Sequence, residues 1–342
     1  MRKRVYIAYT GGTIGMTLSK EGYSPAPGYL KMQMENILEL KSGMMPEYTI
    51  NEYNPLLDSA NMTPDKWAAI AQDIADNYHD YDGFVVLHGT DTMAYTASAL
   101  SFMLEGLNKP VIITGSQIPI CEIRNDARGN LITAILIAGN YNIPEVCLYF
   151  GDRLLRGNRT VKISADELDA FDSPNYSPLG TVGVDIKINW DLMHWDNKEK
   201  ITIHEFAQHS IGTLRLFPGI RADVVENILK PPLEGIVIET YGVGNIPDQN
   251  EALIAVLQKA CAQGLVIVAC TQCLRGTVDL GAYKAGSILE KVGVISGFDM
   301  TTEAALTKMY YLFSRGYNVH EIRRLMQVNI AGELTPRLKK KI

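Results

Sequence analysis

The sequence of 342 residues lacks the features that mark membrane-bound, disulfide-stabilised and nucleic-acid-binding proteins. No run approaches the roughly 20 apolar residues of a membrane span, and the apolar run 5–9 ends at Gly11, too early for a signal peptide. Five cysteines, an odd number lying between Cys121 and Cys273, do not form a typical disulfide framework. A net charge of -6 does not favour nucleic acid. These absences predict a cytoplasmic protein without a membrane or nucleic-acid partner.

The sequence also lacks the motifs of common cofactor and metal sites. It contains no Gly-x-Gly-x-x-Gly and no Gly-Lys-Ser/Thr, so nucleotide cofactors are not indicated. Segment 270–273 is a Cys-x-x-Cys directly after an expected strand, as in a redox pair or half of a zinc site. No second Cys or His pair stands at ligand spacing, so we interpret these residues as structural thiols. We predict no cofactor and no metal.

What is present is a repeated alternation of short apolar runs, polar or Gly-rich turns and segments with helical periodicity. The apolar runs in the first half are 5–9, 84–87, 111–113 and 147–150, and helices are expected at 64–74, with Thr63 as N-cap, and at 93–104. Uninterrupted apolar strands that alternate with helices are typical of a parallel sheet covered on both faces. This half is therefore predicted to be an α/β domain.

The pattern lapses over 189–211 and then resumes. Further strands are expected at 235–238, 265–269 and 292–295, and further helices at 251–263, 302–314 and 319–330. At roughly 100 to 200 residues per domain, the length also favours two domains. We predict an N-terminal α/β domain over 1–188, a linker over 189–211 and a C-terminal α/β domain over 212–342.

Three strand ends carry the residues that are best suited to catalysis or ligand binding. Segments 10–13, 89–92 and 115–117 contain hydroxyls, small residues and one carboxylate. In open α/β sheets ligands bind beyond the carboxyl ends of the strands, so neighbouring strands would bring these loops to one crevice. We expect the functional site there.

The first of these loops, Thr10-Gly11-Gly12-Thr13, is compatible with more than one role. It could be a phosphate cradle at a helix N-terminus, a structural turn, or a nucleophile on a turn that glycine permits. A threonine hydroxyl needs a base to take its proton. No Gly-x-Ser-x-Gly elbow or Ser-His-Asp pattern supplies one. His88 is typical of a packed residue at a strand end, and Lys162 is either a desolvated base or a surface lysine.

Taken together, Thr10-Gly11-Gly12-Thr13-Ile14 and His88-Gly89-Thr90-Asp91-Thr92-Met93 resemble the two signature segments of the bacterial-type L-asparaginase family. Further matches to the family are 55–59, 114–117, 156–160 and 241–245. The resemblance covers essentially the whole chain and is closest to the cytoplasmic type I branch. It implies a larger N-terminal flavodoxin-like parallel sheet covered by helices, and a smaller C-terminal α/β domain.

The resemblance also implies an activity, the hydrolysis of L-asparagine to L-aspartate and ammonia. Thr13 matches the nucleophile that forms a β-aspartyl ester, and Tyr23 matches a tyrosine on the loop that closes over the site. Thr90, Asp91 and Lys162 match the second catalytic group, in which lysine and threonine handle protons and activate water. Metal and cofactor are absent from this scheme.

Binding residues follow from the resemblance in the same way. The positions that match the family's substrate pocket are Asp58, Ser59, Thr90, Asp91 and Ser116. The selectivity between asparagine and glutamine stays open, because one methylene changes it by only about 1–3 kcal/mol. Homodimers or homotetramers are implied, with Asn245 near a neighbour's active site.

Regulation is the point at which the sequence departs from the family. In type I relatives the segment with Thr271 and Cys273 resembles part of an allosteric asparagine site. Regulated relatives place an arginine before the segment that corresponds to Thr240-Tyr241, whereas this chain has Glu239. A glutamate repels the effector carboxylate, so we expect weak or absent activation by asparagine.

Two other functions are compatible with the same fold. The family includes an amidotransferase subunit that releases ammonia for a tRNA-handling partner, but the charge of this chain does not suggest RNA. A non-enzymatic sensor of an amino acid is the second. A sensor has no need of the complete set formed by Thr13, Thr90, Asp91 and Lys162, so an enzyme is favoured.

Overall fold

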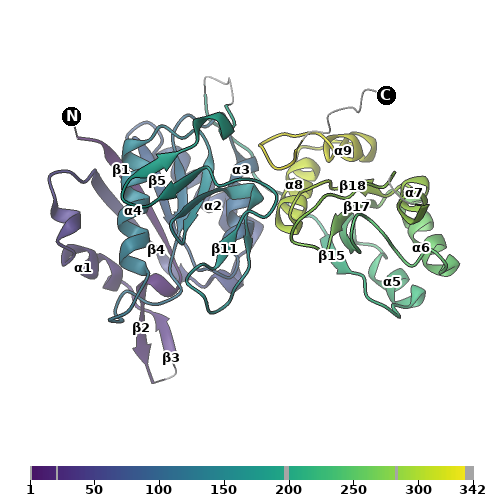
Figure 1. Cartoon of the computed structure of the whole chain (residues 1–342), viewed down its shortest axis with the longest axis horizontal. Coiled ribbons are helices and arrows are strands. Elements are labelled where there is room, and N and C mark those ends of the chain that lie inside the picture. Colours follow the sequence, from purple (N-terminus) through teal and green to yellow (C-terminus); the bar gives the residue numbers. More distant parts are fainter. Residues whose placement is uncertain (1, 21, 196–199, 282–283, 336–342) are drawn as a thin grey trace. The chain divides into compact units, whose positions relative to one another are not determined.

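The computed structural model describes residues 2–20, 22–195, 200–281 and 284–335. The chain forms two compact units, Met1–His204 and Glu205–Ile342 (Figure 1). Each has its own sheet and its own core of buried apolar side chains. The predicted α/β fold, with a larger N-terminal and a smaller C-terminal sheet, is confirmed. Among the described residues no helix has the length and apolar character needed to cross a bilayer.

The first unit is built on an eight-stranded sheet with the order β13-β12-β9-β8-β7-β5-β1-β4. Five neighbouring strands are parallel, namely β4 (Glu47–Leu57), β1 (Arg4–Gly11), β5 (Gly83–Leu87), β7 (Val111–Thr114) and β8 (Val146–Phe150). The antiparallel extension consists of β9 (Arg153–Arg156), β12 (Gly180–Val182) and β13 (Ile186–Ile188). Strands β5, β7 and β8 are buried along their whole length, which explains their uninterrupted apolar sequences.

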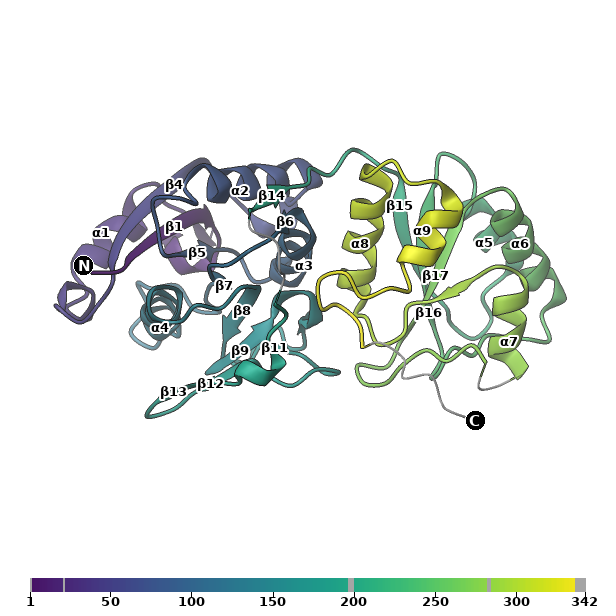
Figure 2. The ribbon, with the colours of Figure 1, turned by 90° about the horizontal axis from the view of Figure 1, so that it is seen from above.

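Helices cover both faces of this sheet (Figure 2). Helix α4 (Ala127–Asn140) lies on one face, and its Leu131 shares a core cluster with Leu30 of α1 (Tyr29–Glu35). Helices α2 (Pro64–Asp76) and α3 (Met93–Met103) lie against the other face. The site can therefore form only at the ends of the strands.

Shorter elements complete the first unit. Strand β2 (Met16–Ser19) pairs with β3 (Gly22–Pro25), β10 (Val161–Lys162) with β11 (Phe171–Asp172), and β6 (Leu104–Glu105) with β14 (Thr202–Ile203). The 3-10 turns are η1 (Thr13–Gly15), η2 (Glu39–Lys41), η3 (Ser59–Asn61), η4 (Gly157–Arg159) and η5 (Trp190–Leu192).

The second unit has a four-stranded parallel sheet. Its strands are β15 (Ile211–Arg215), β16 (Gly235–Thr240), β17 (Val266–Thr271) and β18 (Ile295–Ser296), in that order. Its helices are α5 (Ala222–Ile228), α6 (Glu251–Ala262), α7 (Lys284–Lys291), α8 (Thr302–Ser314) and α9 (Val319–Leu325).

The last helix is shorter than the sequence predicts. A helix over 319–330 is expected from the periodicity, but α9 ends at Leu325, so that prediction is wrong. The cause is the buried ammonium group of Lys308, which donates to the carbonyl oxygens of Met326 at 3.1 Å and Val328 at 2.6 Å. Carbonyl groups that accept from this cation do not accept the next backbone hydrogen bonds of an α-helix.

Candidate active site

The three strand-end loops meet at one edge of the first sheet. Strand β5 pairs in parallel with both β1 and β7, with Leu87 opposite Tyr9 on one side and Thr114 on the other. The hydroxyl of Thr10 donates to the carbonyl oxygen of Leu87 at 2.9 Å, and this bond joins the end of β1 to the end of β5. The predicted convergence of these loops is confirmed.

Glycines allow the loops to pack backbone against backbone. Gly12 has a φ of 91°, and a Cβ there would lie 2.4 Å from the Gly89 nitrogen. A Cβ on Gly89 would lie 2.5 Å from the hydroxyl oxygen of Ser59. Neither position has room for a side chain. The segment that precedes Thr13 therefore lies directly against the segment that precedes Thr90.

Lys162 joins the second loop. It lies on β10, and its Nζ donates to the hydroxyl oxygen of Thr90 at 2.9 Å and to Oδ1 of Asp91 at 2.8 Å. The lysine side chain is only 21% exposed, whereas Asp91 is 66% exposed. Lys162 is thus no free surface lysine, and Asp91 combines a cation partner with access to solvent.

The residues expected to bind substrate lie beside these groups. The Asp58 carboxylate accepts a bond from the Ala60 amide at 3.1 Å, and Ser59 is buried. The hydroxyl of Thr92 donates to the Ser59 carbonyl at 2.7 Å, which ties this turn to the loop that carries Asp91. The hydroxyl of Ser116 is buried and has no hydrogen-bond partner among the described residues.

Tyr23 lies on the hairpin of β2 and β3 and is 45% exposed. Its hydroxyl donates to Oε1 of Glu122 at 2.6 Å, and this bond raises the pKa of Tyr23. Tyr23, Gln117 and Glu122 line a pocket of about 530 Å³. Among the described residues no hydrogen bond joins Tyr23 to Thr13.

His88 follows β5 and is completely buried. Its Nδ1 lies 2.7 Å from the Gly89 carbonyl oxygen, which can only accept, so Nδ1 holds the proton. Its Nε2 then accepts from the Thr96 hydroxyl at 2.9 Å, and Thr96 accepts from the indole of Trp67 at 3.0 Å. Burial lowers the pKa of His88 to about 4. His88 is therefore a neutral packed residue, and its Nδ1 proton is used in the hydrogen bond to the Gly89 carbonyl.

This buried histidine predicts a pH dependence of stability. Its pKa falls from 6.5 to about 4 on folding, which corresponds to about 3 kcal/mol at roughly 1.4 kcal/mol per pKa unit. The unfolded chain takes up the proton first, so this stability is complete above pH 6.5 and is lost as pH falls towards 4. His88→Gln should flatten the pH dependence of the urea midpoint. His79→Gln, at an exposed histidine, is the control and should leave it unchanged. Equal slopes for His88→Gln and wild type would refute the assignment.

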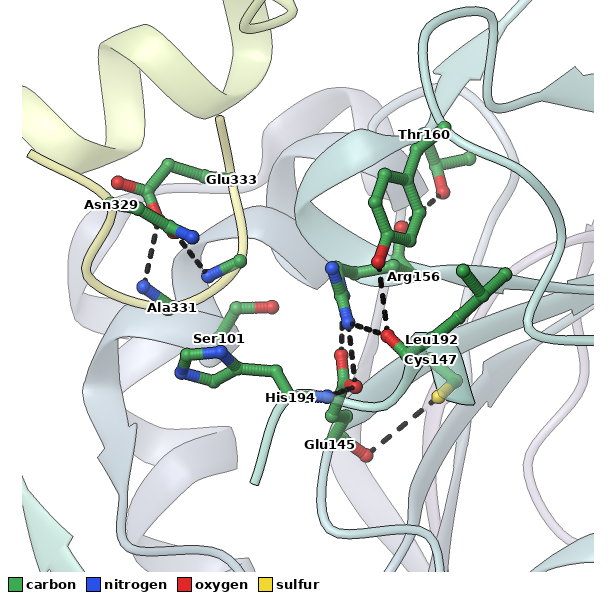
Figure 3. A network of polar contacts seen from close by, with 12 residues as sticks. Ser101, Glu145, Cys147, Arg156, Thr160, Leu192, His194, Asn329, Ala331 and Glu333 are labelled. Carbon is green, nitrogen blue, oxygen red and sulfur yellow. Dashed lines mark hydrogen bonds and ion pairs between the residues drawn. The ribbon is translucent and has the colours of Figure 1, made fainter. Parts of the chain in front are cut away.

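The segment that leads to Lys162 rests on a buried ionic network (Figure 3). Arg156 donates to both carboxylate oxygens of Glu145, at 2.5 and 2.8 Å, and to the carbonyl of Leu192 at 2.6 Å. Its guanidinium lies 4.4 Å from the centre of the Tyr176 ring, and that of Arg159 lies 5.1 Å from the same ring. The bidentate Arg156–Glu145 pair fixes the orientation of the Arg156 side chain at the end of β9. The turn from β9 to β10 therefore starts from a well-anchored residue.

The proposed regulatory positions lie in the second unit. Glu239 accepts from Arg215 at 3.0 Å, and the Thr271 hydroxyl accepts from the backbone amide of Cys273 at 3.1 Å. All five cysteines are free thiols. Burial raises the pKa of Cys270 to about 12, whereas Cys273 is exposed, so the two do not share one environment.

Two family models cover most of the chain. "Asparaginase, N-terminal" matches residues 4–194, and "Glutaminase/Asparaginase C-terminal domain" matches residues 210–326. The chain belongs to the asparaginase family. The resemblance inferred from the two signature segments is thereby confirmed.

Individual asparaginases agree along nearly the whole chain. It is 50% identical over 335 residues to L-asparaginase 1 of Escherichia coli strain K12, covering 98% of this chain and 99% of that protein. L-asparaginase I of Vibrio cholerae, a solved structure, has a TM-score of 0.91 and 47% identity, covering 98% of this chain and 100% of that one. A human relative named 60 kDa lysophospholipase is 44% identical, and the match spans 62% of its length.

The structure also reveals two polar side chains that the sequence interpretation missed. Gln117 contacts Thr90, and Glu122 contacts Tyr23. Both follow a strand end that was singled out, but an amide or a carboxylate in a loop gives no sign of its partner in the sequence. Their roles depend on loops that meet only in the folded asparaginase.

Proposed function

We propose that this asparaginase hydrolyses L-asparagine to L-aspartate and ammonia, with Thr13 as nucleophile and a β-aspartyl ester as intermediate. The observation that supports this best is the junction of two loops. The Thr13 loop packs through Gly12 against Gly89, and Lys162 donates to both Thr90 and Asp91. A weak hydroxyl nucleophile needs such proton-handling groups close by.

In the first step the substrate is held at both charged ends. Asp91 binds the α-ammonium group, and Asp58 with Ser59 grips the α-carboxylate and α-amino ends, so that the amide carbon faces Thr13. The Thr13 oxygen attacks this carbon, and its proton leaves with the amide nitrogen as ammonia. Backbone amides of the glycine-rich turns stabilise the oxyanion, and Ser116 lies near the side-chain amide. Tyr23 closes over the bound substrate.

In the second step water hydrolyses the ester. Thr90 and Lys162 orient the water and take its proton, the water oxygen bonds to the acyl carbon, and the bond to Thr13 breaks. Thr13 regains its proton, and aspartate leaves. The side chains described here complete both steps with no metal and no organic cofactor in the scheme.

The relatives support a proposal for the cellular location. The name L-asparaginase 1 of the Escherichia coli relative fits the cytoplasmic branch that the sequence resembles, and we propose that location for this chain. We further propose a homodimer or a homotetramer, with Asn245 near the active site of a neighbouring copy. The domain boundaries proposed from the sequence, 1–188 and 212–342, bracket the division between the two compact units.

Steady-state kinetics test this function. We expect ammonia release from L-asparagine, and kcat/KM for glutamine measured beside it gives the selectivity that one methylene, at about 1–3 kcal/mol, leaves open. We expect a hyperbolic rate curve, because Glu239 stands where an effector-binding arginine would be and repels the effector carboxylate. Coupled detection of ammonia across a range of asparagine concentrations measures both. D-asparagine serves as the stereochemical control.

Two outcomes would contradict this scheme in different ways. Binding of asparagine without ammonia release would favour the amino-acid sensor. A sigmoidal curve that becomes hyperbolic in Thr271→Ala or Cys273→Ala would show that the regulatory site works despite Glu239.

A further inference from the structure

The side chain of Gln117 connects Thr90 to the loop that follows Lys162. Its Nε2 lies 3.1 Å from the carbonyl oxygen of Glu167, and its Oε1 lies 3.1 Å from the hydroxyl oxygen of Thr90. A backbone carbonyl can only accept, so the amide nitrogen must face Glu167 and the amide oxygen must face Thr90. The Thr90 hydroxyl therefore donates its proton to Gln117.

The backbone of Gln117 is anchored independently of its side chain. Asp126, just before α4, accepts from the amide of Gln117 at 2.9 Å and from that of Ile118 at 3.0 Å. Asn130 donates to the carbonyl of Gly115 at 3.0 Å and to Asp126 at 3.2 Å. Changing the side chain of Gln117 leaves all of these bonds in place.

The far end of the connection is also fixed. The hydroxyl oxygen of Ser164 accepts from the amides of Asp166 at 3.3 Å and Glu167 at 3.0 Å, which shapes the turn after β10. A closed ring results, from Lys162 to Thr90, to Gln117, to the Glu167 carbonyl, and along the chain back to Lys162. The Gln117 amide thus ties the Thr90 hydroxyl to the backbone of the loop that follows Lys162.

We infer that Gln117 is a positioning residue, which fixes the direction of the Thr90 hydroxyl proton; this rests on the proposed role of Thr90. A threonine hydroxyl has one proton and two lone pairs. The Gln117 oxygen accepts the hydrogen bond from this proton, Lys162 donates to one lone pair, and the second lone pair has no donor among the described residues. Without Gln117 the hydroxyl can turn its proton into the crevice, and Thr90 then no longer offers an acceptor to the attacking water.

The first test compares Gln117→Leu with Glu167→Ala. The leucine removes the acceptor for Thr90, so kcat for asparagine should fall about tenfold while KM changes less than about twofold. Glu167→Ala keeps the backbone carbonyl that holds Gln117, so its kcat should match wild type. Melting temperatures check that both variants fold. A Gln117→Leu enzyme with wild-type kcat, or one in which only KM rises, would overturn the inference.

A pH profile separates positioning from mere packing. Gln117→Glu still accepts from Thr90 while its carboxyl is ionised, whereas a protonated carboxyl can donate to Thr90 instead. We expect kcat near wild type at high pH, and an acid limb that moves to higher pH. If Gln117→Glu is as impaired as Gln117→Leu at every pH, the acceptor role is wrong.

The pair Thr90→Val and Gln117→Leu distinguishes this inference from the proposed mechanism. Thr90→Val removes the hydroxyl, so adding Gln117→Leu to it should lower the residual kcat no further. If Thr90→Val is strongly impaired and its residual kcat falls a further tenfold when Gln117→Leu is added, the role of Gln117 is refuted while that of Thr90 stands. A Thr90→Val enzyme with wild-type activity would instead refute the proposed role of Thr90.

Discussion

Replacement of Thr13 by alanine should lower kcat for asparagine by a factor of at least about a thousand, because removal of a nucleophile leaves only oriented binding and oxyanion stabilisation. Thr13 begins η1, directly after Gly12, which packs against Gly89. That packing uses backbone atoms, so the alanine variant should fold normally. Ammonia release in single-turnover and steady-state assays measures the effect.

Thr10 offers a matched control three residues earlier. Thr10 carries the same hydroxyl group as Thr13. Unlike the proposed nucleophile, however, it is buried, and its hydroxyl donates to the Leu87 carbonyl. Thr10→Val should lower stability by about 1 kcal/mol and leave the chemical step nearly intact. The nucleophile assignment fails if Thr13→Ala retains more than a small fraction of wild-type kcat, or if Thr10→Val is the inactive variant.

Glu333→Gln should destabilise the second unit by roughly 3–5 kcal/mol, the range for breaking a buried ion pair. Lys308 and Glu333 are both wholly buried and hydrogen-bonded to each other. Burial lowers the pKa of Lys308, and the nearby Glu333 carboxylate opposes that shift. The neutral amide leaves a buried ammonium group without its counter-charge. Glu333 also accepts from the amide of Ala331 at 2.7 Å, so the turn after α9 should loosen as well.

An exposed ion pair in the same unit provides the comparison. Glu226 accepts from Lys259 at 2.9 Å, and both side chains are exposed to solvent. Glu226→Gln should therefore shift the urea midpoint very little. A shift for Glu333→Gln no larger than that for Glu226→Gln would show that the buried pair contributes little. Fluorescence and circular dichroism together follow the transition in each variant.

The sequence predicted those parts of the fold whose apolar pattern is continuous. Strands β5, β7 and β8 are buried along their length, so their runs were unambiguous. The edge strand Glu47–Leu57 was not predicted, because its residues are only partly buried or exposed. The early end of α9 was also missed, since it depends on Lys308, which lies in another helix.

The residues of the candidate site also fall into those that the sequence predicts and those that it does not. Thr13, Thr90 and Asp91 were predicted because strand ends and two sequence segments marked them. Lys162 was ambiguous, since a lysine after a strand is also typical of a surface; its contacts with Thr90 and Asp91 show that it is not a free surface lysine. Gln117 could not be predicted, because its partner is the carbonyl of a loop fifty residues away.

The contact between Gly12 and Gly89 limits how this enzyme can be re-engineered. Both positions lack room for even a methyl group, so the backbone that presents Thr13 cannot be re-spaced by substitution there. Libraries that aim at a longer amide substrate should keep these two glycines and vary the surrounding side chains instead. The hydroxyl of Ser116, buried and without a hydrogen-bond partner among the described residues, is the most direct place to begin.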